Sequence, residues 1–234
     1  MSNTKSQANN TLEAEVLETW HDNANAWTTA VRTDQIASRR LVTNQAIIDA
    51  VLERKPQSVL DLGCGEGWLA GQLASKGLSV LGVDGVAELT HAAQLQYGDA
   101  VEFATLSYAQ VPSSLAEQRF DLIVCNFSLL GDESVAALLR ALPALLNEAG
   151  GILIQTLHPD TLAETQGNSD GWRRETWQGI GEGFSGSAPW YYRSRGSWLA
   201  LFKSCHWQLA YSKEPLHPQT QLPASIIFYL EPER

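Results

Sequence analysis

The chain has few cysteines, few basic residues and no long apolar run. Its 234 residues include three cysteines, an odd number, with no closely spaced pair of the kind that binds zinc or carries redox chemistry. No apolar run approaches the roughly 20 residues that a membrane-spanning helix needs. The polar start has neither the basic residues nor the apolar stretch of a signal peptide. We therefore expect a cytoplasmic protein without membrane association or a metal site, with a frayed tail over residues 1–10.

Positive charge is scarce. Lysine and arginine number 16 against 26 aspartates and glutamates, which gives a formal net charge of −10. Proteins that bind phosphate backbones carry a basic surface, so this balance argues against nucleic acid as a partner. The length fits one α/β domain with a modest insertion rather than two full domains. The oligomeric state, monomer or homodimer, stays open.

Short apolar strands alternate with helices through the middle of the chain. We predict strands at 59–62, 79–83, 101–104, 121–125 and 151–157, and helices at about 68–75, 86–95, 113–117 and 134–146. Such alternation indicates a parallel sheet with helices on both faces. Two helices are expected before the first strand. A helix at 197–204 and two further strands, at 207–212 and 225–230, are expected to close the sheet.

Residues 160–196 interrupt this rhythm. They are rich in glycine, serine, tryptophan and tyrosine without a clean period, so we predict an insertion of loops or short helices. The chain has eight tryptophans and one methionine, and Trp172, Trp177, Trp190 and Trp198 fall within one short stretch. Two interpretations stay open: the core of a small subdomain, or a lid over the ends of the fourth and fifth strands that holds an apolar or aromatic ligand.

The sharpest motif is the run Val-Leu-Asp-Leu-Gly-Cys-Gly-Glu-Gly-Trp over residues 59–68, a strand that leads into a glycine turn and a helix. Glycines allow the backbone to approach a ligand closely. Asp84 ends the next strand, where a carboxylate can accept hydrogen bonds from both hydroxyls of a ribose. The two features together predict a cofactor that contains adenosine.

Two residues distinguish between such cofactors. Trp68 stands where a dinucleotide site has its third glycine. The Asp61 carboxylate would repel a pyrophosphate but suits a cofactor with an ammonium group and a sulfonium. The pattern favours S-adenosylmethionine over NAD. A noncatalytic module that binds S-adenosylmethionine and an NAD-dependent oxidoreductase remain as alternatives.

Residues 59–70, Asp84 and the strand at 120–126 resemble the class I S-adenosylmethionine-dependent methyltransferases of the small-molecule type, such as those of quinone biosynthesis. The resemblance covers the chain from about residue 40 to the end. It implies a three-layer Rossmann-like α/β fold whose seven-stranded, mostly parallel sheet has the order 3-2-1-4-5-7-6, with the last strand antiparallel. It implies one domain over residues 1–234, with residues 1–55 as a helical cap and residues 160–196 as a lid-like insertion.

The same resemblance implies a set of cofactor contacts. They are Asp61, Gly63, Cys64, Gly65, Asp84, Leu106, Ser107, Asn126 and Phe127. Arg39, or its neighbour Arg40, is a candidate for the cofactor carboxylate, with an exposed helical arginine as the alternative. A catalytic thiol at Cys64 is not expected, because this is a variable position of the turn.

The strand at 120–126 departs from one branch of the family. Methyltransferases of base amino groups carry Asn or Asp, two prolines and an aromatic residue at this point, whereas this chain reads Asn126-Phe127-Ser128-Leu129. Together with the acidic charge, the departure argues against methylation of DNA amino groups. A small-molecule acceptor is expected instead.

His158 follows the fifth strand and is the candidate catalytic base or substrate contact, because ligands bind beyond the carboxyl ends of parallel strands. The alternative is a histidine that anchors the loop. Candidate contacts of an apolar or aromatic acceptor are Trp27, Trp172, Trp190 and Tyr191. A carboxylate on that acceptor could pair with Arg173, Arg174, Arg193 or Arg195, which could equally be surface charges. The sequence thus predicts transfer of a methyl group from S-adenosylmethionine to a small molecule.

Overall fold

The computed structural model describes residues 2–233, which form a seven-stranded sheet, a separate two-stranded sheet and the helices that cover them. The strands of the large sheet are β1 (Ser58–Leu62), β2 (Ser79–Asp84), β3 (Glu102–Thr105), β4 (Phe120–Asn126), β5 (Leu146–Thr156), β8 (Trp207–Lys213) and β9 (Ile226–Pro232). Central strands such as β1 are apolar on both faces, since Val59, Leu60 and Leu62 are fully buried. A parallel sheet covered by helices on both sides requires this pattern.

The order of the large sheet is β3-β2-β1-β4-β5-β9-β8. β9 is antiparallel to both of its neighbours, and the other strand pairs are parallel. The predicted order, with the last strand antiparallel, is confirmed. Because β1, β2 and β4 are parallel and in register, their carboxyl ends meet at one edge of the sheet.

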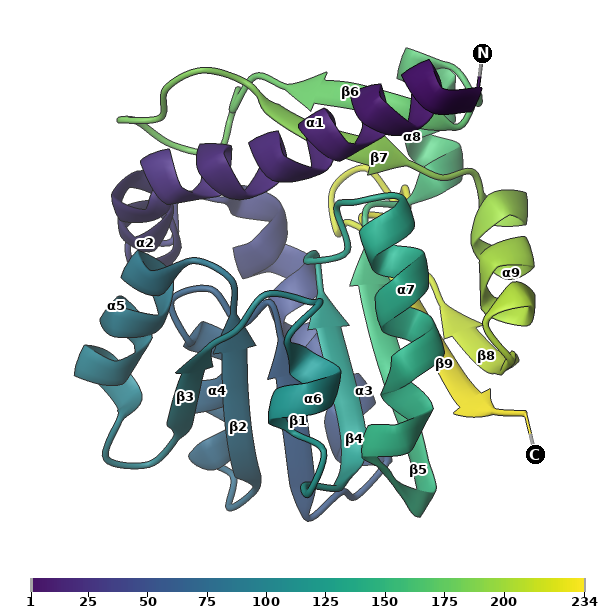
Figure 1. Ribbon diagram of the computed structural model, residues 1–234. Coiled ribbons are helices and arrows are strands. Elements are labelled where there is room, and N and C mark those ends of the chain that lie inside the picture. The colour runs from purple at the N-terminus through teal and green to yellow at the C-terminus, as the bar shows by residue number, and fades with distance from the viewer. Residues whose placement is uncertain (1, 234) are drawn as a thin grey trace.

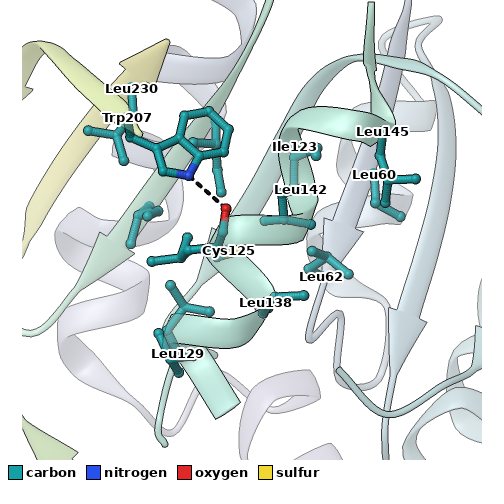
Figure 2. Close-up of a cluster of buried hydrophobic side chains, with 14 of the residues drawn as sticks. Leu60, Leu62, Ile123, Cys125, Leu129, Leu138, Leu142, Leu145, Trp207 and Leu230 are labelled. Atoms are coloured by element: carbon teal, nitrogen blue, oxygen red, sulfur yellow. Dashed lines mark hydrogen bonds between the residues drawn. The ribbon is translucent and has the colours of Figure 1, made fainter. Parts of the chain in front are cut away.

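Helices cover both faces of the sheet. α3 (Asn44–Glu53), α4 (Trp68–Ala74) and α5 (Ala87–Tyr97) pack on one face, and α6 (Val111–Ser114), α7 (Glu133–Ala141) and α9 (Arg195–Ser204) pack on the other (Figure 1). Figure 2 shows the second of these cores, where the buried Trp207 indole N–H donates to the Leu139 carbonyl at 2.8 Å. None of the helices among residues 2–233 is both long and apolar enough to cross a membrane.

The predicted helix at 134–146 is shorter than expected. α7 ends at Ala141, and residues Leu142–Leu145 form a 3₁₀ turn with Pro143 in its first positions. Proline cannot donate the backbone hydrogen bond that would continue an α-helix. β5 therefore begins at Leu146, five residues before the predicted start.

The N-terminal segment contains α1 (Ser2–Asp22), α2 (Ala24–Arg32) and one π-helical turn, η1 (Arg39–Thr43). The expected frayed tail is wrong for residues 2–10, which belong to α1, while Met1 lies outside the described residues. α1 crosses above the carboxyl edge of the sheet (Figure 1). Contacts with distant elements hold it there, such as the bond from the Trp172 indole to Asn9 Oδ1 at 2.5 Å.

The segment at 160–196 contains more regular structure than predicted. After α8 (Pro159–Gln166), β6 (Gly171–Glu175) and β7 (Ala188–Tyr192) pair as an antiparallel hairpin. The prediction of loops or short helices is wrong here, because the two strands are short and separated by a loop of twelve residues, 176–187, that hides their alternation. The hairpin lies over the same edge of the large sheet as α1 (Figure 1).

Candidate functional site

The glycine turn connects β1 to α4 at the carboxyl edge of the sheet. Gly63 has a φ of +74°, and a Cβ atom at this position would lie 2.2 Å from Ser128 Cβ. The amides of Gly63 and Cys64 both donate to the Val83 carbonyl, at 2.7 and 3.0 Å, which fixes the turn against β2. Only glycine fits this position, and the backbone there remains open on its other side to a cavity.

Asp84 braces the same turn from β2. Its Oδ2 accepts a hydrogen bond from the Gly65 amide at 2.9 Å, and its Oδ1 accepts one from the Val86 amide at 2.9 Å. Burial raises the pKa of this carboxyl against the lowering effect of these backbone bonds. The carboxylate lines the cavity, so its remaining lone pairs can accept hydrogen bonds from a ligand.

Asp61 and Glu66 place two further carboxylates beneath the turn. Both side chains are buried, and Asp61 Oδ2 and Glu66 Oε1 have no hydrogen-bond partner in the part of the chain that the structure describes. Burial, then the charges of Asp84 and Glu66, raise the pKa of Asp61 to about 7. The charge of Arg39 offsets these carboxylates only in part, and the remaining negative charge favours a cationic ligand at the turn.

A cavity of about 370 Å³ lies above the turn. We call it the first cavity. The turn and the ends of β2 and β4 form its floor, and α1 forms its roof with Glu13, Ala14, Val16, Leu17 and Trp20. Its remaining lining includes Trp27, Arg39, Gly63, Gly65, Asp84, Ser107, Tyr108, Asn126, Phe127, Leu130 and Ser134.

A second cavity of about 250 Å³ adjoins the first. Its lining includes tryptophan and tyrosine rings from the N-terminal helices, the 160–196 segment and α9: Trp20, Trp27, Trp177, Trp190, Tyr191, Tyr192 and Trp198. Five residues line both cavities: Trp20, Trp27, Arg39, Phe127 and Leu130. We call these five residues the junction.

Arg39 is the charged residue of the junction. Its guanidinium lies 5.4 Å from the centre of the Trp27 ring and 5.3 Å from that of Trp68, and its Nε donates to Asn44 Oδ1 at 3.2 Å. Burial lowers its pKa, while the charges of Glu66 and Asp61 oppose that shift. Arg39 belongs to the π-helical turn, a distortion that occurs often at functional sites. Its environment therefore differs from that of an exposed helical arginine.

Most of the predicted cofactor contacts are brought together. Gly63, Gly65, Asp84, Ser107, Asn126, Phe127 and Arg39 line the first cavity. Three do not line it: Asp61 lies buried below the turn, Leu106 packs against the hydrophobic core, and the buried Cys64 thiol lies 3.6 Å from the Gly65 carbonyl. Burial raises the pKa of Cys64 well above its usual value, which keeps the thiol protonated.

His158 lies outside both cavities. Its Nδ1 accepts a hydrogen bond from the Thr161 amide at 3.3 Å, and its Nε2 lies 3.2 Å from a carboxylate oxygen of Glu214 and 3.1 Å from Arg195. The ring is buried, with 5% of its surface exposed. Both nitrogens are engaged within the protein, so the geometry favours the loop-anchoring alternative over the catalytic base.

The hairpin brings some of the predicted aromatic contacts to the second cavity and leaves one outside it. Trp190 and Tyr192 line the second cavity, as do Trp27 and Tyr191. Trp172 does not: its indole donates to Asn9 in α1 and its ring packs edge-on against Tyr191 at 5.6 Å. The expectation that Trp172 lines the ligand site therefore has no support in this geometry.

The four arginines of the insertion are all engaged elsewhere. Arg173 donates to the Gly167 carbonyl, Arg174 pairs with Glu15, Arg193 pairs with Asp132, and Arg195 pairs with Asp160 and Glu214. None is left free to bind a carboxylate on a ligand.

Sequence reasoning missed Glu13, Tyr108 and Glu175, which line the two cavities. A signal for Glu13 existed. With Val16, Leu17 and Trp20 it forms a stripe at helical spacing, and a charged residue within an apolar stripe indicates a buried polar contact. Glu175 carried no such signal, because the strand that orients it was not predicted.

A family model described as "Methyltransferase domain" matches residues 36–208. A ubiquinone biosynthesis O-methyltransferase of Pseudomonas paraeruginosa is 33% identical over 105 residues, which are 44% of this chain and 45% of that protein. The chain thus matches less than half the length of this curated relative. An uncharacterized methyltransferase of Mycobacterium bovis is 27% identical over 156 residues, which are 65% of this chain and 75% of that protein.

Solved structures show the same fold. The 1,6-didemethyltoxoflavin-N1-methyltransferase of Burkholderia thailandensis, crystallised with 1,6-didemethyltoxoflavin and S-adenosylhomocysteine, superposes with a TM-score of 0.65 at 20% identity, covering 97% of this chain and 91% of that one. A methyltransferase of Clostridium acetobutylicum superposes with a TM-score of 0.62 at 16% identity, covering 80% of this chain and 89% of that one.

Proposed function

The chain belongs to the methyltransferase domain family, and on this premise we propose that it binds S-adenosylmethionine in the first cavity and transfers its methyl group to a small molecule in the second. The observation that carries the proposal is the junction. Two cavities that share Trp27, Arg39 and Phe127 as a common wall can hold a donor and an acceptor side by side. Proximity of this kind supplies much of the rate enhancement of a two-substrate reaction.

The residues of the first cavity fit this cofactor. The turn at Gly63 and Gly65 allows close backbone approach, and Asp84 can accept bonds from ribose hydroxyls. Ser107 lies beside Asp84 on the same floor. The unpaired Asp61 Oδ2 supplies negative charge near an ammonium and a sulfonium. When bound, S-adenosylmethionine supplies an electrophilic methyl group on sulfur.

The chain itself contributes orientation, exclusion of water and charge. Asn126 ends β4 and Phe127 follows it; both line the first cavity, and Phe127 also lines the second. The rings of Trp20 and Trp27 present aromatic surface at the junction. Such a surface attracts the positively charged sulfonium, and the attraction fades as the methyl group is transferred and the sulfur loses its charge. Arg39 offers a guanidinium fork to the cofactor carboxylate.

The acceptor we propose is an aromatic small molecule. Seven tryptophan and tyrosine residues line the second cavity, and such rings favour planar apolar ligands. Two relatives whose names state a pathway or a ligand, the ubiquinone biosynthesis O-methyltransferase and the didemethyltoxoflavin N-methyltransferase, support a small molecule as acceptor. Binding of a carboxylated acceptor through the arginines of the insertion is not part of the proposal, because those side chains are engaged.

In this proposal the chain functions as one domain. Residues 1–55 act as the cap and residues 160–196 as the lid, because α1 roofs the first cavity and the hairpin walls the second. The alternative of a noncatalytic module would require tight cofactor binding without a place for an acceptor, and the second cavity argues against it. The NAD-dependent alternative is disfavoured by Asp61 and Trp68.

The test is formation of S-adenosylhomocysteine from S-adenosylmethionine in the presence of a panel of phenols, quinols and nitrogen heterocycles, with mass spectrometry to detect methylated product. We expect product from at least one class, and loss of product in Asp84→Ala. Cofactor binding without turnover of any panel member would favour the noncatalytic module. Absence of cofactor binding would overturn the proposal.

A further inference from the structure

Trp20 stands at right angles to two other tryptophan rings that line the second cavity. The planes of Trp20 and Trp27 meet at 86° with centroids 5.0 Å apart, and those of Trp20 and Trp177 meet at 89° with centroids 5.4 Å apart. Phe184 stacks on Trp177 at 4.8 Å and fixes that ring. Each perpendicular contact covers one ring face with the edge of its neighbour, and the aromatic faces that stay uncovered attract cations.

The hairpin adds a carboxylate to these walls. Glu175 pairs in register with Ala188, and its strand neighbour Arg173 pairs with Trp190. Glu175 lines the second cavity, as do Ala188 and Trp190, whereas Arg173 does not line it and lies over the Trp190 and Tyr192 rings. Among the described residues Glu175 is the only aspartate or glutamate that lines this cavity. Its Oε1 accepts a bond from the Thr176 amide at 2.8 Å, which leaves acceptor capacity for a ligand.

The other charges of the second cavity are compensated. Arg193 donates to the carbonyls of Gly131 and Asp132 at 2.8 and 3.0 Å and pairs with the Asp132 carboxylate at 3.0 Å. Arg39 lies at the junction, where the negative charges of Asp61 and Glu66 act on it. Glu175, by contrast, has no ion-pair partner among the described residues.

We propose that Glu175 is a substrate-recognition residue and that the acceptor is a planar aromatic molecule with a positively charged nitrogen, held between the tryptophan rings and paired with this carboxylate. The inference rests on the proposed function and narrows its acceptor. Glu175 is not one of the junction residues, so the nitrogen that it pairs with is not the atom that receives the methyl group.

The experiment measures binding of three probes that share the quinoline ring system to the protein saturated with S-adenosylhomocysteine. The probes are 1-methylquinolinium, quinoline and quinoline-4-carboxylate at pH 8, and the method is isothermal titration calorimetry. We expect the cation to bind about tenfold more tightly than neutral quinoline, and the carboxylate to bind most weakly, as an ion pair in a partly buried site predicts.

Variants assign the preference to its residue. Glu175→Gln, which keeps shape and removes charge, should abolish the cation preference, whereas Glu182→Gln, an exposed charge in the same segment outside the cavity, should retain it. In the wild type, raising the NaCl concentration from about 0.05 M to about 0.5 M should reduce the preference.

Three results would overturn the inference: absence of 1-methylquinolinium binding, equal or tighter binding of the carboxylate, or an unchanged preference in Glu175→Gln. Failure of the proposed function is separate, because it would appear at the first step as an inability to bind S-adenosylhomocysteine.

Discussion

Glu13 in α1 holds Ser134 at the start of α7, 121 residues away in the sequence. Its Oε2 accepts a hydrogen bond from the Ser134 hydroxyl at 2.5 Å, and its Oε1 accepts one from the Asp132 amide at 2.7 Å. A carboxylate is favoured at a helix N-terminus, where backbone amides lack partners and the helix dipole is positive. Because both Glu13 and Ser134 line the first cavity, this contact fastens the roof over the proposed cofactor.

Glu13→Ala should therefore loosen the roof. We expect S-adenosylhomocysteine to dissociate about tenfold faster, in line with the loss of a helix-capping side chain. Displacement followed by intrinsic tryptophan fluorescence measures this rate, since Trp20 lies in the roof. Glu18→Ala, an exposed position of the same helix, is the control and should leave the rate unchanged. Equal rates in both variants would show that Glu13 does not hold the roof.

Gly63→Ala should cost far more than Gly77→Ala. Both glycines have positive φ, +74° and +86°, so both substitutions carry a backbone cost of about 1 kcal/mol. Only at Gly63 would the new Cβ meet another atom, Ser128 Cβ at 2.2 Å, whereas nothing lies within 4 Å at Gly77. We expect Gly77→Ala to bind S-adenosylmethionine normally and Gly63→Ala to lose binding by calorimetry. Normal binding by Gly63→Ala would contradict the structure of the turn.

Asp61→Asn should stabilise the fold at high pH. The folded pKa of Asp61 is about 7, above its ordinary value of 3.8. At pH values below the unfolded pKa, the Asp61 carboxyl is protonated in both the folded and the unfolded state, so it does not lower the free energy of unfolding. As pH rises from there to about 7, the unfolded state ionises more readily, and the folded state becomes progressively less stable. The cost above pH 7 is as much as about 4 kcal/mol. Thermal unfolding at pH 4 and pH 8 measures the difference between variant and wild type.

The stabilisation should appear at pH 8 and fade toward pH 4. Asp99→Asn, at an exposed position, should show no such trend. Asp61→Asn should also bind S-adenosylmethionine more weakly than the wild type at pH 8, because a cationic ligand favours the ionised Asp61 carboxylate. A stability difference that does not vary with pH would contradict the assigned environment of Asp61.

His158→Gln should affect stability and not the chemical step. The imidazole bonds Thr161 through Nδ1 and approaches Glu214 through Nε2, and neither nitrogen reaches a cavity. We expect a loss of about 1–3 kcal/mol in unfolding free energy, a similar loss in Glu214→Gln, and an unchanged dependence of kcat on pH for an acceptor from the panel. Loss of the acidic limb of that profile in His158→Gln would show that His158 is the catalytic base after all.

Much of the fold could be predicted from local patterns. The alternation of apolar strands and helices gives the parallel sheet, because each buried strand must be apolar on both faces. The motif at 59–68 and Asp84 locates the floor of the first cavity, since a glycine turn and a strand-end carboxylate are local features of the chain. Asp84 does lie against the turn, through its bond to the Gly65 amide.

The remaining part depends on contacts between distant segments. The hairpin was missed because β6 and β7 are only five residues each, and their faces are set by α1 on one side and the second cavity on the other. His158 was expected near the ligand from its place after β5, but Thr161 and Glu214 bind its ring away from the cavities. Position at a strand end does not fix the direction of a side chain.

The most direct test of the account is isothermal titration of the protein with S-adenosylmethionine, S-adenosylhomocysteine and NAD, repeated with Asp84→Ala. We predict binding of the first two and none of NAD, with a loss of at least about tenfold in Asp84→Ala as its hydrogen bonds to the ribose are removed. Binding of NAD alone, or of none of the three, would contradict the proposed function.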